Sequence, residues 1–290
     1  MKPLFKSKAF AFLFSLAVLA GLIVSCDDND SPGPNKVTTQ VKLATSSTLG
    51  SYLVDSAGYT LYFFTLDADG TNHCASGNCM AAWPIYYKAN LTQEMLGEGL
   101  LLADFAEITT ASGAKQLTYK GWPLYYYSPT SNGIKEQPGE TKGEGVGTVW
   151  YVAKTDYTIM LANRQLVGQD GKNYKSDYTE GTGVTQFFTD GKGRTLYTFT
   201  ADSKNTTSCT SSGCKSTWPA FTESLASVPS ALDKSLFGTI DVDGKKQLTY
   251  KGWPLYYFAQ DSGRGMTKGV SVPNPGVWPV AIKDAVEAPN

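Results

Sequence analysis

The stretch KQLTYKGWPLYY occurs twice without a change, at Lys115–Tyr126 and again at Lys246–Tyr257. Twelve identical residues that include one Trp and three Tyr do not recur by chance, so the chain arose by internal duplication. Alternating strands around a two-residue Lys-Gly turn predict a β-hairpin at each copy. The same layout appears four times in all, with second strands that read TLYFF, PLYYY, TLYTF and PLYYF. The sequence therefore predicts four related hairpin units.

Composition points to an all-β protein. The 290 residues include 29 Gly and 14 Pro, and 12% are aromatic, which favours short strands and many turns over helices. We expect two tandem homologous small β domains, each made of two hairpin-based half-repeats. One closed four-unit, propeller-like structure is the alternative, because the hairpins are almost evenly spaced. The expected segments are a signal peptide (1–25), an acidic and Pro/Gly-rich tether (26–36), repeat domain 1 (37–154), a linker with the first strand of domain 2 (155–182) and repeat domain 2 (183–285).

The N-terminal segment is typical of an export signal. Three lysines in the first eight residues precede an apolar run, Ala9–Val24, that is too short and wrongly flanked for a stable membrane span. The run ends in Ile23-Val24-Ser25-Cys26, which resembles the bacterial lipobox, so we expect lipidation of Cys26. An ordinary signal peptide with a stray Cys is the alternative. The acidic run Asp27–Asp30 resembles the surface-export signal of Bacteroidota lipoproteins. These features predict an outer membrane lipoprotein, on the periplasmic face or cell surface, whose acylated Cys26 inserts into the lipid membrane.

Aligning the four second strands reveals a motif of a Tyr, an aromatic residue two positions on, and an Asp three positions later. Strand alternation places the Tyr and the second aromatic on one face and the preceding Leu on the other. Thr130 stands where the second unit should carry its Asp. The residues of this repeat motif are Tyr62, Phe64, Asp67, Tyr125, Tyr127, Tyr197, Phe199, Asp202, Tyr256, Phe258 and Asp261.

This motif, followed by Cys-x4-Cys and Trp-Pro, resembles the bacterial lipoproteins called "secreted repeat of unknown function", also described as predicted lipoproteins with a Yx(FWY)xxD motif. The resemblance extends from about Gly50 to Ile282, and QLTYKGWPLYYY and GEGVGTVWYV are similar to the second half-repeat of that family. Besides Thr130, the last unit departs from the pattern, since it reads GVWPVAIK in place of the Gly-rich Gly143–Trp150. The resemblance implies that a pair of units is the smallest independent body, and it implies no particular activity.

Four of the five cysteines form two equivalent Cys-x4-Cys pairs. In an exported protein such pairs predict structural disulfides, here Cys74–Cys79 and Cys209–Cys214. Redox or metal use is the alternative, but a zinc site would need two more ligands for each pair. His73, the only histidine, has Ser208 at the equivalent place. We therefore expect no metal site.

No residue pattern in the sequence specifies a catalytic site. We expect the repeated Asp to accept hydrogen bonds from loop amides or from a Tyr hydroxyl, although a catalytic carboxylate is the alternative. Asp67–Asn72 has the oxygen-rich spacing of a calcium loop, for which a polar turn is the preferred interpretation. A serine hydrolase would need a base, and the single His is not repeated. No basic stripe accompanies the net charge of −1, so nucleic acid is not an expected partner.

The aromatic residues of the repeated hairpins are the remaining candidates for a binding surface. Such residues usually form the core of a small β domain, but a ring exposed beside Lys120 or Lys251 would stack on a sugar ring or on a flat ligand such as haem. The candidate ligand-binding residues are Lys120, Trp122, Tyr126, Lys251, Trp253 and Tyr257. We predict a non-catalytic binding or structural module of the cell envelope, without a cofactor, whose partner is a glycan or an envelope protein. The alternative is an electron-transfer or metal- or haem-carrying accessory lipoprotein, and a hydrolase that uses the repeated aspartates comes third.

Overall fold

The computed structural model describes residues 37–290. The predicted all-β fold is confirmed: within this range five small sheets and two short α-helices form, and the sheets are separate rather than closed into one ring. The expected signal peptide, Cys26 and the tether lie outside the described residues. Below, residues 37–154 are called the first half and residues 155–290 the second half. The division into two independent domains stays a prediction.

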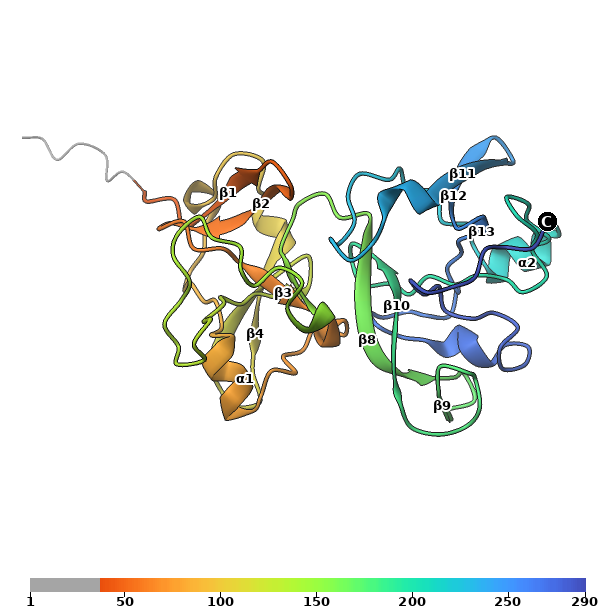
Figure 1. The fold of residues 1–290 in the computed structure, drawn as a ribbon, viewed down its shortest axis with the longest axis horizontal. Helices are drawn as coiled ribbons and strands as arrows, with labels where there is room; N and C mark the ends of the chain where they lie inside the picture. The colour runs from red at the N-terminus through yellow and green to blue at the C-terminus, as the bar shows by residue number, and fades with distance from the viewer. Residues whose placement is uncertain (1–36) are drawn as a thin grey trace, which may run out of the picture. The chain divides into compact units, whose positions relative to one another are not determined.

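The first half contains three sheets and one helix (Figure 1). β1 (Val41–Ser46) pairs with β2 (Gly50–Asp55), and β3 (Tyr62–Phe64) pairs with the distant β7 (Trp150–Val152). β4 (Phe105–Thr109), β5 (Lys115–Tyr119) and β6 (Trp122–Pro123) form the third sheet, and α1 spans Gly77–Ala82. Short 3-10 turns cover Thr65–Asp67, Gln93–Met95, Leu102–Asp104 and Val146–Thr148.

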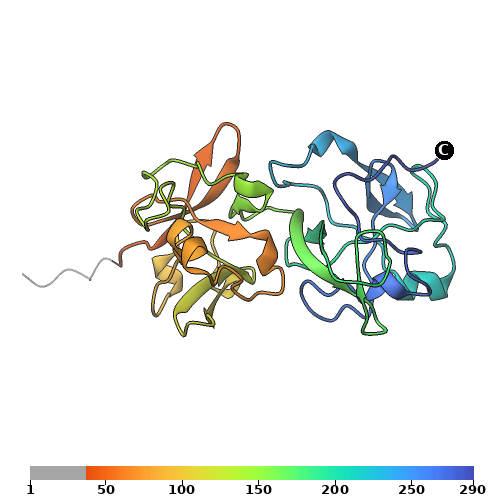
Figure 2. The ribbon, with the colours of Figure 1, turned by 60° about the horizontal axis from the view of Figure 1, so that its bottom comes forward.

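The second half repeats this plan. β8 (Ile159–Val167), a long curved strand in both views, pairs with β10 (Val184–Asp190) and with the short β9 (Asn173–Tyr174) (Figure 1, Figure 2). β11 (Phe237–Val242), β12 (Lys245–Tyr250) and β13 (Trp253–Pro254) match β4, β5 and β6, and α2 (Ser212–Thr217) matches α1. Its 3-10 turns cover Lys234–Leu236 and Lys268–Ser271.

The predicted two-residue turns are confirmed. At Lys120-Gly121 and Lys251-Gly252 both residues have positive φ, 48° and 80° in the first copy and 49° and 81° in the second. Asp243-Gly244, the turn between β11 and β12, has φ angles of 51° and 74°. Two successive left-handed residues match the twist of the flanking strands, so each hairpin closes in two residues.

The second strand of each repeated hairpin pairs with the first strand over fewer residues than the sequence predicts. Its tyrosine pairs instead with the tyrosine strand of another unit. Tyr62 and Tyr125 exchange both backbone hydrogen bonds, at 2.8 and 3.0 Å, and Tyr197 and Tyr256 do the same at 2.8 and 2.9 Å. The tyrosine strands of two units thus lie antiparallel and satisfy each other's backbone groups. Each half is therefore one pair of units joined at their tyrosines.

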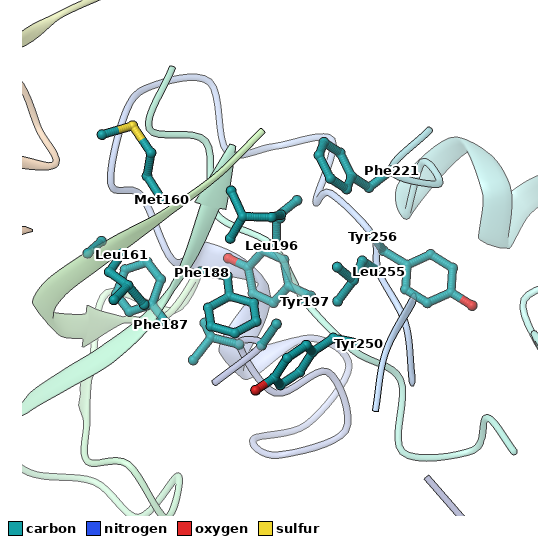
Figure 3. Packing of buried hydrophobic residues seen from close by; sticks show 14 of the residues in the cluster. Met160, Leu161, Phe187, Phe188, Leu196, Tyr197, Phe221, Tyr250, Leu255 and Tyr256 are labelled. Atoms are coloured by element: carbon teal, nitrogen blue, oxygen red, sulfur yellow. The ribbon is translucent and has the colours of Figure 1, made fainter. Parts of the chain in front are cut away.

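The core of the first half is layered as the strand alternation predicts, whereas that of the second half is one cluster. In the first half, Leu61 and Leu124 lie in one buried cluster, whereas Tyr62, Tyr125 and Phe64 lie in another. The second half has a single larger cluster, in which residues of β8, β10 and the repeat strands interlock (Figure 3). Figure 3 labels Met160, Leu161, Phe187, Phe188, Leu196, Tyr197, Phe221, Tyr250, Leu255 and Tyr256 of this cluster. It also includes Phe63, Trp122 and Tyr151, so the apolar core continues from one half into the other.

The two α-helices were not predicted from the sequence. Each begins between the cysteines of a Cys-x4-Cys pair, where the polar composition favoured a loop. The hydroxyl oxygens of Ser76 and Ser211 cap them by accepting the amides of Cys79 and Cys214, both at 3.2 Å. Within residues 37–290, we find no helix both long and apolar enough to cross a membrane.

Candidate functional site

The repeated tyrosines each donate a hydrogen bond to a buried carboxylate that belongs to the other unit of the pair. Tyr125 Oη donates to Asp67 Oδ2 at 2.6 Å, and Tyr62 Oη donates to Glu136 Oε1 at 2.5 Å. In the second half Tyr256 donates to Asp202 at 2.8 Å and Tyr197 to Asp261 at 2.5 Å. We call these four contacts the tyrosine–carboxylate exchange. A buried phenol needs such a partner, so the exchange holds the units of each pair together.

The second oxygen of each carboxylate is also occupied. It accepts a hydrogen bond from a loop backbone amide at 2.7 to 2.9 Å. The donors are the amides of His73, Lys142, Ser208 and Lys268, for Asp67, Glu136, Asp202 and Asp261 in that order. This is the hydrogen-bonding role that the sequence predicts for the repeated Asp. Burial raises the pKa of Asp202 and of Asp261 to about 6, against the lowering effect of these hydrogen bonds, and it also raises the pKa of Asp67 and Glu136.

Glu136 was missed from the sequence, where Thr130 stands at the aligned position. A signal exists in the spacing, because the carboxylate lies six residues before the amide it accepts in three units and seven in the fourth. The amides of unit 2 and unit 4 belong to a shared Thr-Lys-Gly, at Thr141–Gly143 and Thr267–Gly269. A methyl group on Gly143 would lie 2.8 Å from the Tyr62 ring, and one on Gly269 would lie 2.9 Å from the Tyr197 ring. The last unit therefore keeps, at Gly269, the glycine that lets the backbone approach the tyrosine ring.

The second motif aromatic and the closing Trp form a ring stack in each half. Phe64 stacks on Trp150 at 3.9 Å between centroids, and Trp150 stacks on Trp83 at 3.8 Å, with interplanar angles of 6° and 4°. Phe199, Trp278 and Trp218 repeat this arrangement at 4.0 Å for both contacts. Tyr127 and Phe258 tilt against the end of each stack. These motif aromatics are part of the apolar core.

The six candidate ligand-binding residues do not come together in one place, and the polar groups they carry are engaged within the chain. Trp122 is 2% exposed, and its indole N–H donates to the Gly191 carbonyl at 3.2 Å. Their other hydrogen bonds run from Lys120 to the Thr155 carbonyl, Tyr126 to Asp55, Lys251 to the Lys283 and Ala285 carbonyls, Trp253 to the Val286 carbonyl, and Tyr257 to Asp190. As ligand contacts these residues stay a prediction.

Both predicted disulfides are present, with Cα separations of 5.4 Å for Cys74–Cys79 and 5.5 Å for Cys209–Cys214. Each bond ties the first turn of its helix to the loop before it. His73 directly precedes the first disulfide in the sequence, and its Nδ1 lies 3.3 Å from Asp67 Oδ1. Hydrogen bonding to Asp67 raises the pKa of His73, against its partial burial. Within residues 37–290 no group of three or more His, Cys, Asp or Glu side chains is arranged to hold a metal.

A cleft opens beside each disulfide, at the same place in both halves. The first cleft, about 540 Å³, lies between the helix segment and the turn after β4, and its lining includes Asn72, Cys74, Met80, Ile85, Ala111 and Ala114. The second cleft, about 270 Å³, has the equivalent lining at Thr207, Cys209, Lys215, Ala220 and Val242, together with Gln247. Duplication has thus placed a cleft next to the disulfide-pinned loop in each half.

The two clefts differ at their mouths. Lys215 of α2 and Asp243 of the β11–β12 turn form an ion pair at 2.6 Å that spans the second cleft. Met80 and Ser112 occupy these positions in the first half, so the first cleft lacks that ion pair and is wider and more apolar. Sequence inspection missed both clefts, because their walls come from segments about 35 residues apart that only the fold brings together.

Fold and site together define a duplicated β-repeat protein. In each pair of units, the tyrosine of one unit donates a hydrogen bond to a carboxylate of the other, and a disulfide holds a short helix beside a cleft. A family model described as a secreted repeat of unknown function matches residues 44–86, 106–154, 182–222 and 239–282. The chain therefore belongs to this family, as the motif resemblance predicts. No curated protein and no solved structure matches the chain.

Proposed function

We propose that this protein is a non-catalytic binding module of the cell envelope and that the first cleft is its principal ligand site. The observation that carries the proposal is the recurrence of the cleft beside both disulfides. A volume of about 540 Å³ is within the usual range for small-molecule sites. A disulfide and a capped helix hold one wall rigid, which lowers the entropy cost of binding.

The lining indicates the class of ligand. Met80, Pro84, Ile85, Ala111 and Ala114 make most of the first cleft apolar, and polar groups lie at its edge. An apolar ring or an aliphatic group would remove this surface from water. The lack of a charged side chain in the lining favours a neutral ligand. A flexible Met at the mouth suits a site that adapts to its occupant.

The non-catalytic part of the proposal rests on the repeated carboxylates. Asp67 and Asp202 are 0% and 1% exposed, and both oxygens of each already accept a hydrogen bond. A catalytic carboxylate must reach its substrate directly or through one water. In this protein the carboxylates face tyrosines of the partner unit, which supports a structural role for them.

The envelope address is proposed from the N-terminal sequence and the family's description as secreted. Acylated Cys26 would hold the repeats at the outer membrane, with residues 26–36 as a tether. We expect Cys26→Ala to abolish labelling with radioactive palmitate and to release the protein from membranes. Continued labelling of the variant would contradict the lipoprotein assignment.

The ligand site is tested by titrating the full-length chain, in detergent and with ¹³C-methyl-labelled Met, with indole as a neutral probe. The Met80 methyl resonance is expected to shift saturably. Ala111→Trp places a ring in the first cleft and should weaken binding about tenfold or more. Val242→Trp, the matched change in the second half, should leave the Met80 response unchanged. An unchanged Met80 resonance in the wild-type protein, or equal loss in both variants, would overturn the proposal.

A further inference from the structure

The second cleft contains a buried acceptor that the protein itself leaves unpaired. Gln247 of β12 is 1% exposed and lines this cleft. Its Nε2 donates to the Leu255 carbonyl at 2.9 Å, which fixes the orientation of the amide. Its Oε1 has no hydrogen-bonding partner among residues 37–290. A buried acceptor without a partner lowers the stability of the fold, so it is rarely left unpaired without a reason.

The first half shows which group is missing. Gln116, the equivalent of Gln247, makes the same bond to the Leu124 carbonyl at 2.9 Å. Its Oε1, however, accepts a hydrogen bond from Asn72 Nδ2 at 2.7 Å. Thr207 replaces Asn72 in the second half, and its hydroxyl is engaged with Tyr256 Oη at 2.6 Å. The second cleft thus lacks the donor that Asn72 supplies, and a ligand would have to bring it.

The rest of the lining narrows the chemistry of that ligand. Pro219, Ala220 and Trp218 offer apolar surface, whereas Thr222 and the side chains of Lys215 and Lys245 offer polar contacts towards the mouth. An ammonium ligand would meet two lysines, and the one carboxylate in the lining, that of Asp243, is already paired with Lys215. A carboxylate offers no donor for Gln247 Oε1. A neutral ring with hydroxyl groups on its edge and an apolar face satisfies both requirements.

We propose that the second cleft binds a neutral pyranose sugar, one hydroxyl of which donates to Gln247 Oε1. A cleft of about 270 Å³ has room for a single ring or the end of a glycan. The inference deepens the binding function proposed above by giving the second cleft its own ligand class. The two halves then differ in specificity: the first cleft takes an apolar group and the second a hydroxylated one.

The experiment titrates the full-length chain, in a detergent without sugar groups, with the methyl glycosides of glucose, galactose and N-acetylglucosamine. The indole N–H resonance of Trp218 reports the second cleft, and that of Trp83 is its counterpart in the first half. Saturable shifts at Trp218 and none at Trp83 are expected with at least one glycoside. No shift at Trp218 with any of the three, at millimolar concentrations, would overturn the proposal and leave water as the partner of Gln247.

Two exchanges between the halves complete the test. Thr207→Asn supplies the internal donor and should weaken glycoside binding roughly tenfold or more, the scale of one buried hydrogen bond. Asn72→Thr, the reverse exchange, should leave the Trp218 response unchanged. Thr222→Trp, at an exposed position of the mouth, blocks the cleft without touching Gln247 and should also abolish binding. Equal affinity in Thr207→Asn and the wild-type protein would contradict the assignment to Gln247.

The indole titration of the first cleft is recorded on the same samples, so the two proposals fail separately. A Met80 response without a Trp218 response rejects the sugar and retains the binding function. A Trp218 response without a Met80 response rejects the first cleft as the ligand site and retains the sugar proposal for the second cleft.

Discussion

The same twelve residues, KQLTYKGWPLYY, lie in two different environments. Trp122 is buried: its ring packs on Phe63 at 5.1 Å between centroids, and the Arg264 guanidinium of the second half lies 4.9 Å above it. Trp253, its identical counterpart, is partly exposed, and its indole N–H donates to the Val286 carbonyl of the C-terminal segment at 2.8 Å. Local sequence thus determines the hairpin, and the burial of its tryptophan depends on which segment of the chain packs against it.

Arg264 shows how much the first environment depends on the second half. It donates hydrogen bonds to the carbonyls of Lys120 and Lys192, one in each half. Burial lowers its pKa to about 10, so the guanidinium stays charged near neutral pH. The equivalent carbonyl in the second copy, that of Lys251, accepts the backbone amide of Ala288 at 3.0 Å instead. The first hairpin is thus held by contacts from the second half, and the second hairpin by contacts from residues 283–290.

The largest expected difference follows from this contrast. Trp122→Ala should lower the free energy of unfolding by about 3 to 5 kcal/mol, because it leaves a cavity in a continuous core. Trp253→Ala should cost only about 1 to 2 kcal/mol, because its ring already meets solvent. Urea denaturation of both variants measures the difference. Equal losses would mean that the two halves do not share a core in solution.

Removal of one tyrosine hydroxyl tests the tyrosine–carboxylate exchange. Tyr125→Phe leaves Asp67 Oδ2 buried without its donor and should cost about 1 to 3 kcal/mol. Tyr256→Phe should cost at least as much, since it also removes the contact with Thr207. Tyr127→Phe is the matched control, because its hydroxyl makes no hydrogen bond within the described residues, and it should change stability by less than about 0.5 kcal/mol. A control as costly as Tyr125→Phe would reject the exchange as the cause.

The disulfides should contribute less, and equally. Each closes a short loop, so replacement of either Cys pair by Ala should cost about 2 kcal/mol on the chain-entropy model. Thermal denaturation of the Cys74→Ala/Cys79→Ala and Cys209→Ala/Cys214→Ala variants compares the halves directly. The first variant should also lose indole binding, because its cleft wall is no longer pinned. Undiminished binding would remove the disulfide from the account of the first cleft.

The smallest expected effect is one of pH. The pKa of Asp261 is about 6 in the folded protein and about 4 in the unfolded chain, so the folded state holds this proton more tightly. Its contribution is complete below pH 4 and is lost as the pH rises through 6. Asp261→Asn should therefore be less stable than the wild-type protein at pH 4.5, and the gap should shrink by roughly 1 to 2 kcal/mol by pH 7.5. Urea midpoints at both pH values decide this, and a gap that widens would contradict the sign.

Much of this architecture could be predicted from the sequence because it is local or repeated. The hairpin turns, the face alternation of Leu and Tyr, and both Cys pairs follow from spacing alone. The partner of Tyr62 could not be found at the aligned position, because unit 2 has a longer loop and its carboxylate comes from Glu136. The clefts could not be predicted for a different reason. One wall of each is a short helix in a polar segment that reads as a loop, and the other is a turn from a separate hairpin. Contacts between distant segments are set by tertiary packing, on which residue patterns carry little information.

The tyrosine–carboxylate exchange also constrains how such a gene can change its length. Each unit places its phenol in its neighbour and receives a phenol in return, so neither unit is complete alone. An insertion of one extra unit would bury a phenol and a carboxylate that have no counterpart, whereas an insertion of two would satisfy both. Recombination within this chain should therefore yield folded products only when it adds or removes an even number of repeats.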